Sequence, residues 1–143
     1  GVEHRLENVA IIKDVTYIND SKATNLDSVS VAIQSFNKPV VLILGGRNKG
    51  SDFRLLLPHI KSSHVRDIIS YGEAGGQIST AIGDAVRSVQ VTDLNSAVKT
   101  AQRLAAPGDV VLLSPGCASF DQFENFEERG RYFKTKVMEM MAA

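Results

Sequence analysis

The side chains best suited to chemistry gather in short polar segments that directly follow apolar runs. The first segment, residues 19–25, reads NDSKATN and offers the carboxylate of Asp20, the ammonium group of Lys22 and several hydroxyl groups. Such groups bind phosphates and carboxylates through charge-assisted hydrogen bonds. Taken alone, Lys22 is better interpreted as an exposed lysine beside a capped helix start. A second cationic loop on the same edge of the sheet makes Lys22 a candidate for holding a phosphate or carboxylate.

A second polar segment, residues 45–50, reads GGRNKG. Its glycines would let backbone N–H groups approach an anion, and Arg47 and Lys49 add positive charge. The segment is not a Walker A loop, because no Gly-Lys-Ser/Thr sequence occurs in the chain, and no G-x-G-x-x-G fingerprint is present either. A tight turn between a strand and a helix, with solvated cations, remains the alternative to an anion site.

A third polar segment, residues 114–120, reads SPGCASF. Cys117 is a candidate nucleophile, but no spacing motif marks any of the three histidines as its base, so a small structural residue is the favoured interpretation. Ser119 and the backbone N–H groups of this segment are better candidates as carboxylate ligands. The histidines and acidic residues show no metal-ligand spacing, and we expect no metal site within the chain.

The elements that must position these segments are short strands alternating with helices. A two-residue hairpin turn at Lys13 and Asp14 is predicted between the first two strands. The later runs are rich in Val, Ile and Leu, which is typical of strands buried on both faces. We therefore predict an α/β, Rossmann-like, mostly parallel sheet of about six strands, with helices on both faces and an N-terminal β-hairpin. The predicted strands cover residues 8–12, 15–18, 40–44, 65–70, 88–91 and 109–114.

Helix boundaries are predicted from caps and breakers. Thr24 with Asp27 resembles a capping box, and Asp121 with Glu124 could cap a last helix in which Gly130 allows close packing. Pro58 should shorten the helix that follows residue 52. The apolar helix faces are predicted to be Leu26, Val29, Ile33 and Phe36; Ala97, Val98, Ala101, Leu104 and Ala105; and Phe126, Phe133, Val137 and Met140.

In an open parallel sheet, ligands bind outside the carboxyl ends of the strands. The polar segments at 19–25, 45–53, 71–76 and 115–123 each follow a predicted strand, so they should line one edge of the sheet. This convergence is the strongest indication of a binding site that the residue pattern provides.

Bulk composition agrees with one globular domain. The chain has 143 residues, of which 43% are hydrophobic, and 16 basic residues balance 16 acidic ones. A neutral chain gives no reason to expect a nucleic-acid or membrane partner. The single cysteine excludes an intrachain disulfide, and no apolar run approaches the length of a membrane span. The chain begins GVEHRLE without Met, which suggests a processed product or an excised domain.

Four stretches together carry a family resemblance: EHRLE, INDSKATN, LILGGRNKGSDF and LLSPGCASFDQFENFEERG. In this order and spacing they resemble the C-terminal domain of the Mur ligase family. The resemblance covers essentially the whole chain, so residues 1–143 are expected to form one such domain. The second and fourth stretches are most similar to the family member that adds D-glutamate to UDP-N-acetylmuramoyl-L-alanine in peptidoglycan synthesis.

The resemblance implies roles for individual residues in an ATP-dependent ligation that passes through an acyl phosphate. Two residues would contact the nucleotide, one would act near the transferring phosphate, and four would bind the carboxylates of D-glutamate. His4 and Asn25 are weaker candidates. The assigned residues are Arg5 and Asp20 for the nucleotide, Lys22 for catalysis, and Thr24, Lys49, Ser119 and Phe126 (through its backbone) for D-glutamate.

The resemblance also implies partners. ATP and Mg²⁺ would be held mainly by a central domain, and the UDP-linked substrate by an N-terminal domain, and this chain contains neither. We therefore expect the chain alone to be inactive, and the full-length enzyme to be a cytoplasmic bacterial monomer. Two alternatives from other classes stay open: a stand-alone Rossmann-like module that binds anions or nucleotides, and a hydrolase that uses Cys117.

Overall fold

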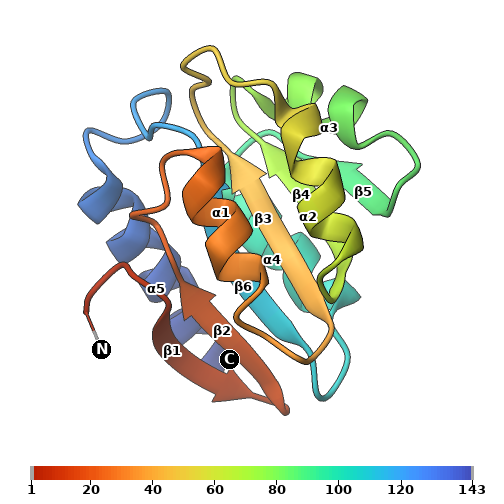
Figure 1. The fold of residues 1–143 in the computed structure, drawn as a ribbon. Coiled ribbons are helices and arrows are strands. Elements are labelled where there is room, and N and C mark those ends of the chain that lie inside the picture. The colour runs from red at the N-terminus through yellow and green to blue at the C-terminus, as the bar shows by residue number, and fades with distance from the viewer. Residues whose placement is uncertain (1, 143) are drawn as a thin grey trace.

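The computed structural model describes residues 2–142 and contains one six-stranded sheet (Figure 1). The spatial strand order is β1-β2-β6-β3-β4-β5, with β1 and β2 antiparallel and all other neighbours parallel. The predicted fold class is confirmed. The strands are β1 (Glu7–Ile12), β2 (Val15–Asn19), β3 (Val40–Gly45), β4 (Val65–Tyr71), β5 (Arg87–Gln90) and β6 (Val110–Gly116).

The N-terminal hairpin forms as predicted. Ile12 pairs with Val15 across the turn, and the two turn residues have positive φ angles, 51° at Lys13 and 63° at Asp14. Two consecutive residues with positive φ are typical of the type I′ turn, whose twist matches that of a two-stranded ribbon. The turn therefore sets the register of β1 on β2.

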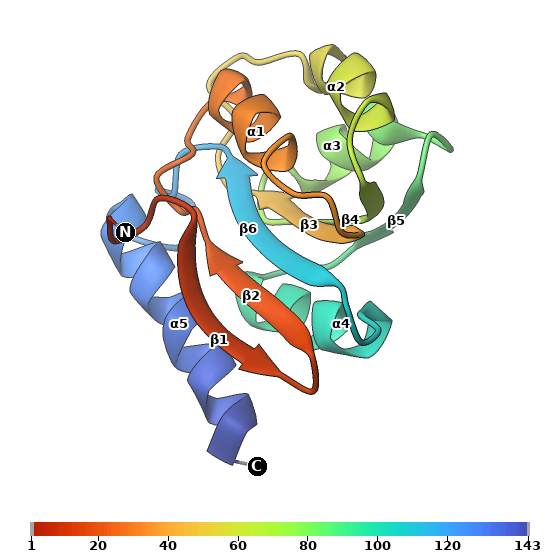
Figure 2. The ribbon, with the colours of Figure 1, turned by 60° about the horizontal axis from the view of Figure 1, so that its bottom comes forward.

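Two helical layers enclose the sheet (Figure 2). One apolar cluster lies under α1 (Leu26–Ile33), the 3₁₀ helix η1 (Phe53–Leu56), α2 (Leu57–Lys61) and α3 (Gly75–Ile82). The other lies under α4 (Leu94–Leu104) and α5 (Phe126–Ala142). Every residue of β3 and β6 is buried, which explains their continuous apolar character.

Two predicted helix caps were wrong. Asn25, not Thr24, caps α1, and its Oδ1 accepts a hydrogen bond from the Ser28 N–H at 2.9 Å. Likewise Asn125 Oδ1 accepts from the Glu128 N–H at 2.7 Å, so α5 begins at Phe126 rather than after Asp121. In both cases an amide side chain lies three residues before the N–H it accepts from, which is ideal N-cap geometry.

The remaining helices differ in how well the pattern predicted them. Pro58 stands in the first turn of α2, and that helix has only five residues, as expected of the segment after residue 52. By contrast α3 was not predicted, because its first residues, Gly75 and Gly76, are typical of loops. No helix within residues 2–142 combines the length and the apolar character needed to cross a membrane.

Candidate functional site

The polar segments meet at the carboxyl edge of the sheet, as predicted (Figure 1). Arg47 N donates to Ala118 O at 2.8 Å and Ala118 N donates back to Arg47 O at 3.0 Å, which joins the loops after β3 and β6. Gly116 N donates to Ala23 O at 2.8 Å, which joins the loop after β2 to the end of β6. The loops therefore form one continuous rim.

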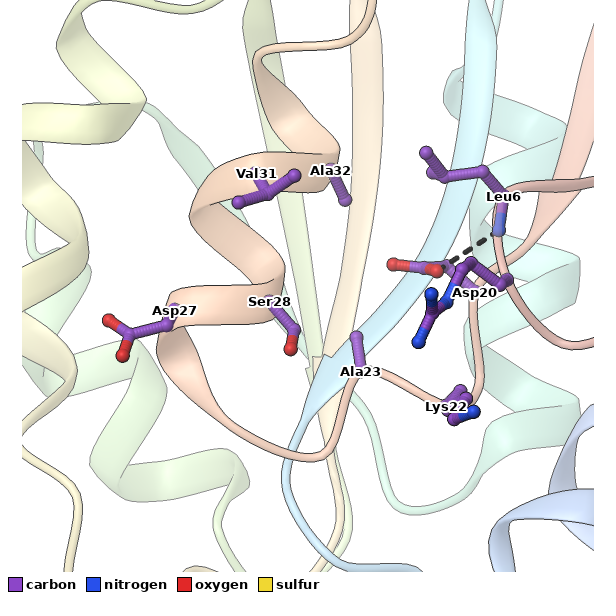
Figure 3. A pocket seen from close by; sticks show the side chains of 9 residues that line it. Leu6, Asp20, Lys22, Ala23, Asp27, Ser28, Val31 and Ala32 are labelled. Carbon is purple, nitrogen blue, oxygen red and sulfur yellow. Dashed lines mark hydrogen bonds between the residues drawn. The ribbon is translucent and has the colours of Figure 1, made fainter.

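A pocket of about 310 Å³ opens at this rim between the N-terminal segment, the loop after β2 and α1. Three residues with predicted nucleotide or catalytic roles line it: Arg5, Asp20 and Lys22. Figure 3 shows Asp20 and Lys22 on the loop beside the first turns of α1. The structure thus brings together the guanidinium of Arg5, the carboxylate of Asp20 and the ammonium group of Lys22. Arg5 and Lys22 lie 17 positions apart in the sequence.

Asp20 is held firmly although it lines the pocket. Its exposed fraction is 5%; Oδ1 accepts from the Leu6 N–H at 3.0 Å and Oδ2 from the Ser114 hydroxyl at 2.8 Å. Burial raises the pKa of Asp20, and the hydrogen bonds from Ser114 and Leu6 partly offset this effect. A carboxylate can accept about four hydrogen bonds, so two acceptor positions remain for hydroxyl groups of a ligand.

Arg5 reaches the pocket because the N-terminal segment is tied to the loop after β2. Lys22 N donates to His4 O at 3.0 Å, one residue before Arg5. The backbone of His4 and Leu6 adopts positive φ angles of 68° and 42°, which non-glycine residues adopt only when their surroundings enforce them. The buried His4 ring supplies that constraint, since it contacts the Phe126 ring edge-on and Nδ1 lies 2.9 Å from Asn19 Nδ2.

The cations of the rim differ in availability. Lys22 and Lys49 are exposed, and neither forms an ion pair within residues 2–142. Arg47 instead pairs with Glu73, with Nε 2.9 Å from Oε2, so its charge is already compensated. This difference supports Lys22 and Lys49 as ligand contacts and leaves Arg47 with a role between loops.

The other predicted D-glutamate contacts lie on the same rim. Thr24 is half-buried next to Ala23, and the Phe126 carbonyl accepts from the Ser21 hydroxyl at 2.7 Å, beside Lys22. Ser119 is only 2% exposed. Little of its surface is therefore open to a ligand.

The hydrolase alternative finds no support at Cys117. The thiol is 1% exposed, and burial raises its pKa to about 12. The thiolate is the nucleophilic form, and it would be scarce at neutral pH. Within residues 2–142, no three His, Cys, Asp or Glu side chains converge to form a candidate metal site.

One residue of the site escaped prediction from the sequence. Arg129 of α5 is 0% exposed and hydrogen bonds to Ser21 and Cys117, in two of the rim loops. A weak signal existed, because Arg129 lies four and eight positions before Phe133 and Val137 and so shares their buried helix face. Nothing else distinguished it from the exposed Arg131.

Comparison with known proteins establishes the family. The family described as "Mur ligase, glutamate ligase domain" matches residues 4–117. The chain belongs to this family. A protein of Chlamydia caviae is 50% identical over 97% of the chain, and one of Salinibacter ruber is 47% identical over 96%. Both are named UDP-N-acetylmuramoylalanine–D-glutamate ligase. The chain spans 33% and 30% of their lengths, about a third of each.

Solved structures of Mur ligases share the fold. The murein peptide ligase Mpl of Psychrobacter arcticus superposes with a TM-score of 0.68 at 13% identity, over 96% of this chain and 30% of that one. A domain of a ligase from Haemophilus ducreyi, solved by itself, gives a TM-score of 0.64 at 16% identity, over 93% of this chain and 99% of that one. At such identities the likeness concerns the fold alone.

Proposed function

We propose that the chain is the C-terminal, D-glutamate-binding domain of an ATP-dependent ligase that joins D-glutamate to UDP-N-acetylmuramoyl-L-alanine. The observation that supports this most directly is the 47–50% identity, over nearly the whole chain, to ligases named for this reaction. The rim adds independent support, because its free cations and hydrogen-bond donors suit a ligand with several negative groups.

The nucleotide side of the proposed site is the pocket of Arg5 and Asp20. The Asp20 carboxylate has free acceptor positions for ribose hydroxyls, and its two existing hydrogen bonds fix its orientation. Arg5 would add a cation toward the phosphates. Since the pocket is open on one side, most of the nucleotide would lie against another domain, which fits ATP and Mg²⁺ being held mainly outside this chain.

The D-glutamate side of the proposed site is the adjoining part of the rim. D-glutamate carries two carboxylates, so it needs donors from more than one direction. Lys49 would supply a cation from the loop after β3, and Thr24 and Ser119 would supply hydroxyl donors. The first free backbone N–H groups of α5, near Phe126, would supply the rest, and the positive end of that helix favours an anion.

The proposed reaction places Lys22 between the two parts of the site. The γ-phosphoryl group of ATP passes to the substrate carboxylate and leaves ADP. The amine of D-glutamate then attacks the carbonyl carbon, loses a proton and expels phosphate as the amide bond forms. Lys22 would stabilise the negative charge that develops during these steps. Holding the amine beside the acyl phosphate can lower the barrier by about 7–11 kcal/mol.

The remaining substrates and domains belong to the same proposal. We propose that an N-terminal domain for the UDP-linked substrate and a central ATP-binding domain complete the enzyme in the same polypeptide. We propose further that the enzyme is a cytoplasmic monomer with no nucleic-acid or membrane partner. Residues 1–143 then form a single domain that closes over the nucleotide.

A backbone amide NMR titration of this chain with D-glutamate tests the proposed binding role, with L-glutamate and ADP as controls. We expect shifts confined to the loops around Thr24, Lys49 and Ser119, larger for D- than for L-glutamate, and ADP shifts around Arg5 and Asp20. Equal responses to any anion would favour a generic anion-binding module instead. A complementary assay measures phosphate release by the full-length ligase with each glutamate enantiomer.

A further inference from the structure

Among residues 2–142, Arg129 is the largest completely buried side chain, and it lies where the loops after β2 and β6 meet. Its Nε donates to Ser21 Oγ at 2.9 Å and one terminal nitrogen, Nη2, donates to Ser21 O at 2.8 Å. The other, Nη1, donates to Cys117 O at 2.9 Å. A planar guanidinium presents five donors in a fixed fork and can satisfy acceptors on two loops at once, whereas a lysine ammonium has three donors on a single nitrogen.

Within the described part of the chain, Arg129 has no ion-pair partner, and the Asp121 carboxylate acts on its charge only from beyond salt-bridge distance. Its three acceptors are a hydroxyl and two carbonyl oxygens, and no carboxylate within residues 2–142 forms an ion pair with it. An arginine stays protonated at neutral pH, and a buried charge without a counter-charge is costly. Tying two loops together does not by itself require a full charge. An anion bound at the rim would supply the missing counter-charge.

The residues that Arg129 contacts lie next to residues with proposed ligand roles. Ser21 precedes Lys22, and the Ser21 hydroxyl also donates to the Phe126 carbonyl. Cys117 lies two positions before Ser119 in the same loop. The loop after β3 packs here as well, since a Cβ at Gly46 would lie 3.3 Å from Arg129 Nη1.

We infer that Arg129 is a positioning residue of this site. Its guanidinium fixes residues 19–25 against residues 114–121, and its buried charge, which has no ion-pair partner among the described residues, favours the binding of carboxylates and phosphates at the rim. The identity of those anions rests on the proposed function. The tie between the two loops does not depend on the proposed function.

Hydrogen exchange of the 143-residue chain tests the tie between the loops. We compare Arg129→Lys, Arg129→Gln and Ser21→Ala with Arg131→Gln, a matched change of an exposed arginine on the same helix. We expect faster exchange in residues 19–25 and 114–121 for the first three variants, with the centre of β3 and the control unchanged. If Arg129→Gln does not fold, Ser21→Ala still tests the tie between the loops. That variant removes only the hydroxyl that accepts from Arg129 Nε and donates to the Phe126 carbonyl. Unchanged exchange in both loops would overturn the inference.

Steady-state kinetics of the full-length ligase test the effect on ligand binding. We expect the KM for D-glutamate to rise about tenfold in Arg129→Lys and about 100-fold in Arg129→Gln, because only the lysine keeps the charge. A purely structural role would reduce the active fraction and leave KM unchanged, and that result would overturn the inference. If KM rose equally in both variants, the charge of Arg129 would not contribute to D-glutamate binding, and that part of the inference would be overturned. An inactive wild-type ligase would refute the proposed function instead, and hydrogen exchange would then decide whether Arg129 ties the loops.

Discussion

At the level of single residues, the rim is held together by side chains that bond to backbone groups and hydroxyls of other loops. Asp20 accepts from the Leu6 N–H and the Ser114 hydroxyl, and Arg129 donates to the carbonyls of Ser21 and Cys117. Loops lack the regular hydrogen-bond ladder of strands, so such bonds must define their shape. Substitutions of these partners should alter the site without removing any ligand contact.

Replacing Ser114 with alanine should leave Asp20 Oδ2 buried without its partner. We expect the free energy of unfolding to fall by about 1.5–3 kcal/mol and the pKa of Asp20 to rise further, since the Ser114 bond favours the ionised form. Because the pKa of folded Asp20 lies above its ordinary value of 3.8, stability falls as pH rises from 3.8 through the folded value. Ser114→Ala should widen the pH range between 3.8 and the folded pKa of Asp20, over which stability falls.

Urea denaturation and a carboxyl ¹³C NMR titration of Asp20 measure these two effects. The exposed hydroxyl bond from Ser30 to Asp27 O offers a control, and Ser30→Ala should change neither quantity appreciably. An unchanged Asp20 pKa in Ser114→Ala would show that the hydroxyl does not orient this carboxylate in solution.

Gly130 is the point of closest approach between α5 and the N-terminal segment. A Cβ there would overlap the His4 imidazole and come within 3.0 Å of Asn19 Nδ2. We therefore expect Gly130→Ala to destabilise the chain by about 1–3 kcal/mol, measured by chemical denaturation. Gly76→Ala, an exposed helical position with 3.8 Å of clearance, should be neutral or stabilising by less than about 1 kcal/mol. Equal effects of the two changes would contradict this account.

At the level of elements, the short edge strand β5 is held by charge as well as by the sheet. Asp67 of β4 is 1% exposed, stands opposite Arg87 of β5 in the register, and hydrogen bonds to that residue and to Arg66. Burial raises the pKa of Asp67, but these hydrogen bonds outweigh it and hold the pKa below its ordinary value. Arg66 also reaches Asp109, just before β6.

Asp67→Asn should therefore loosen β5. We expect a loss of about 1–3 kcal/mol in unfolding free energy at pH 7, with faster hydrogen exchange in β5. Since the folded pKa of Asp67 is depressed, its contribution is present above the unfolded value near 3.8 and disappears as pH falls through the folded value. The variant should thus lose less stability than the wild type below pH 3.8. Asp84→Asn, an exposed change just before the same strand, serves as the control.

The sequence predicted the sheet well because its signals are local. Runs of Val, Ile and Leu indicated all six strands, and the Lys13–Asp14 pair indicated the hairpin turn. Helix starts were predicted less well, since Asn25 and Asn125 compete with neighbouring residues that cap equally well in isolation. Helix α3 was missed because its stability comes from packing Ile78 and Ile82 against the sheet, which outweighs the low helix propensity of its glycines.

The sequence predicted the candidate ligand-binding residues of the site but not the side chains that support them. The loops that carry Lys22, Lys49 and Ser119 do converge, because parallel strands fix that edge of the sheet. The supporting contacts of Arg129 with Ser21 and Cys117 were not predictable, since they join segments far apart in the sequence through carbonyl groups that every residue carries. The ligand roles of the individual residues stay predictions.

At the level of the whole molecule, the chain has an apolar core on each face of its sheet, and under the proposed function its reaction centre is incomplete. Apolar clusters lie on both faces of the sheet, and the Haemophilus ducreyi domain of the same fold was solved by itself. The chain, however, spans only about a third of its curated relatives and contains no Gly-Lys-Ser/Thr loop. We therefore expect this chain to fold by itself without catalysing the ligation.

We expect the purified chain to unfold cooperatively in denaturant and yet to release no ADP from ATP in the presence of D-glutamate and UDP-N-acetylmuramoyl-L-alanine. The reason is that this chain lacks the phosphate-binding loop of an ATPase. A coupled assay for ADP measures this, with the full-length ligase as the positive control. Ligation by the pure chain at a rate above background would contradict the proposed division of roles.

The position of β6 also affects how the chain can fold during synthesis. Residues 110–116 insert between β2 and β3, so the two halves of the sheet have no direct hydrogen bonds until this last strand arrives. A nascent chain stalled before residue 110 would expose two unpaired strand edges, on β2 and on β3, and each is a potential partner for aggregation. Most of the domain must therefore leave the ribosome before its sheet can close.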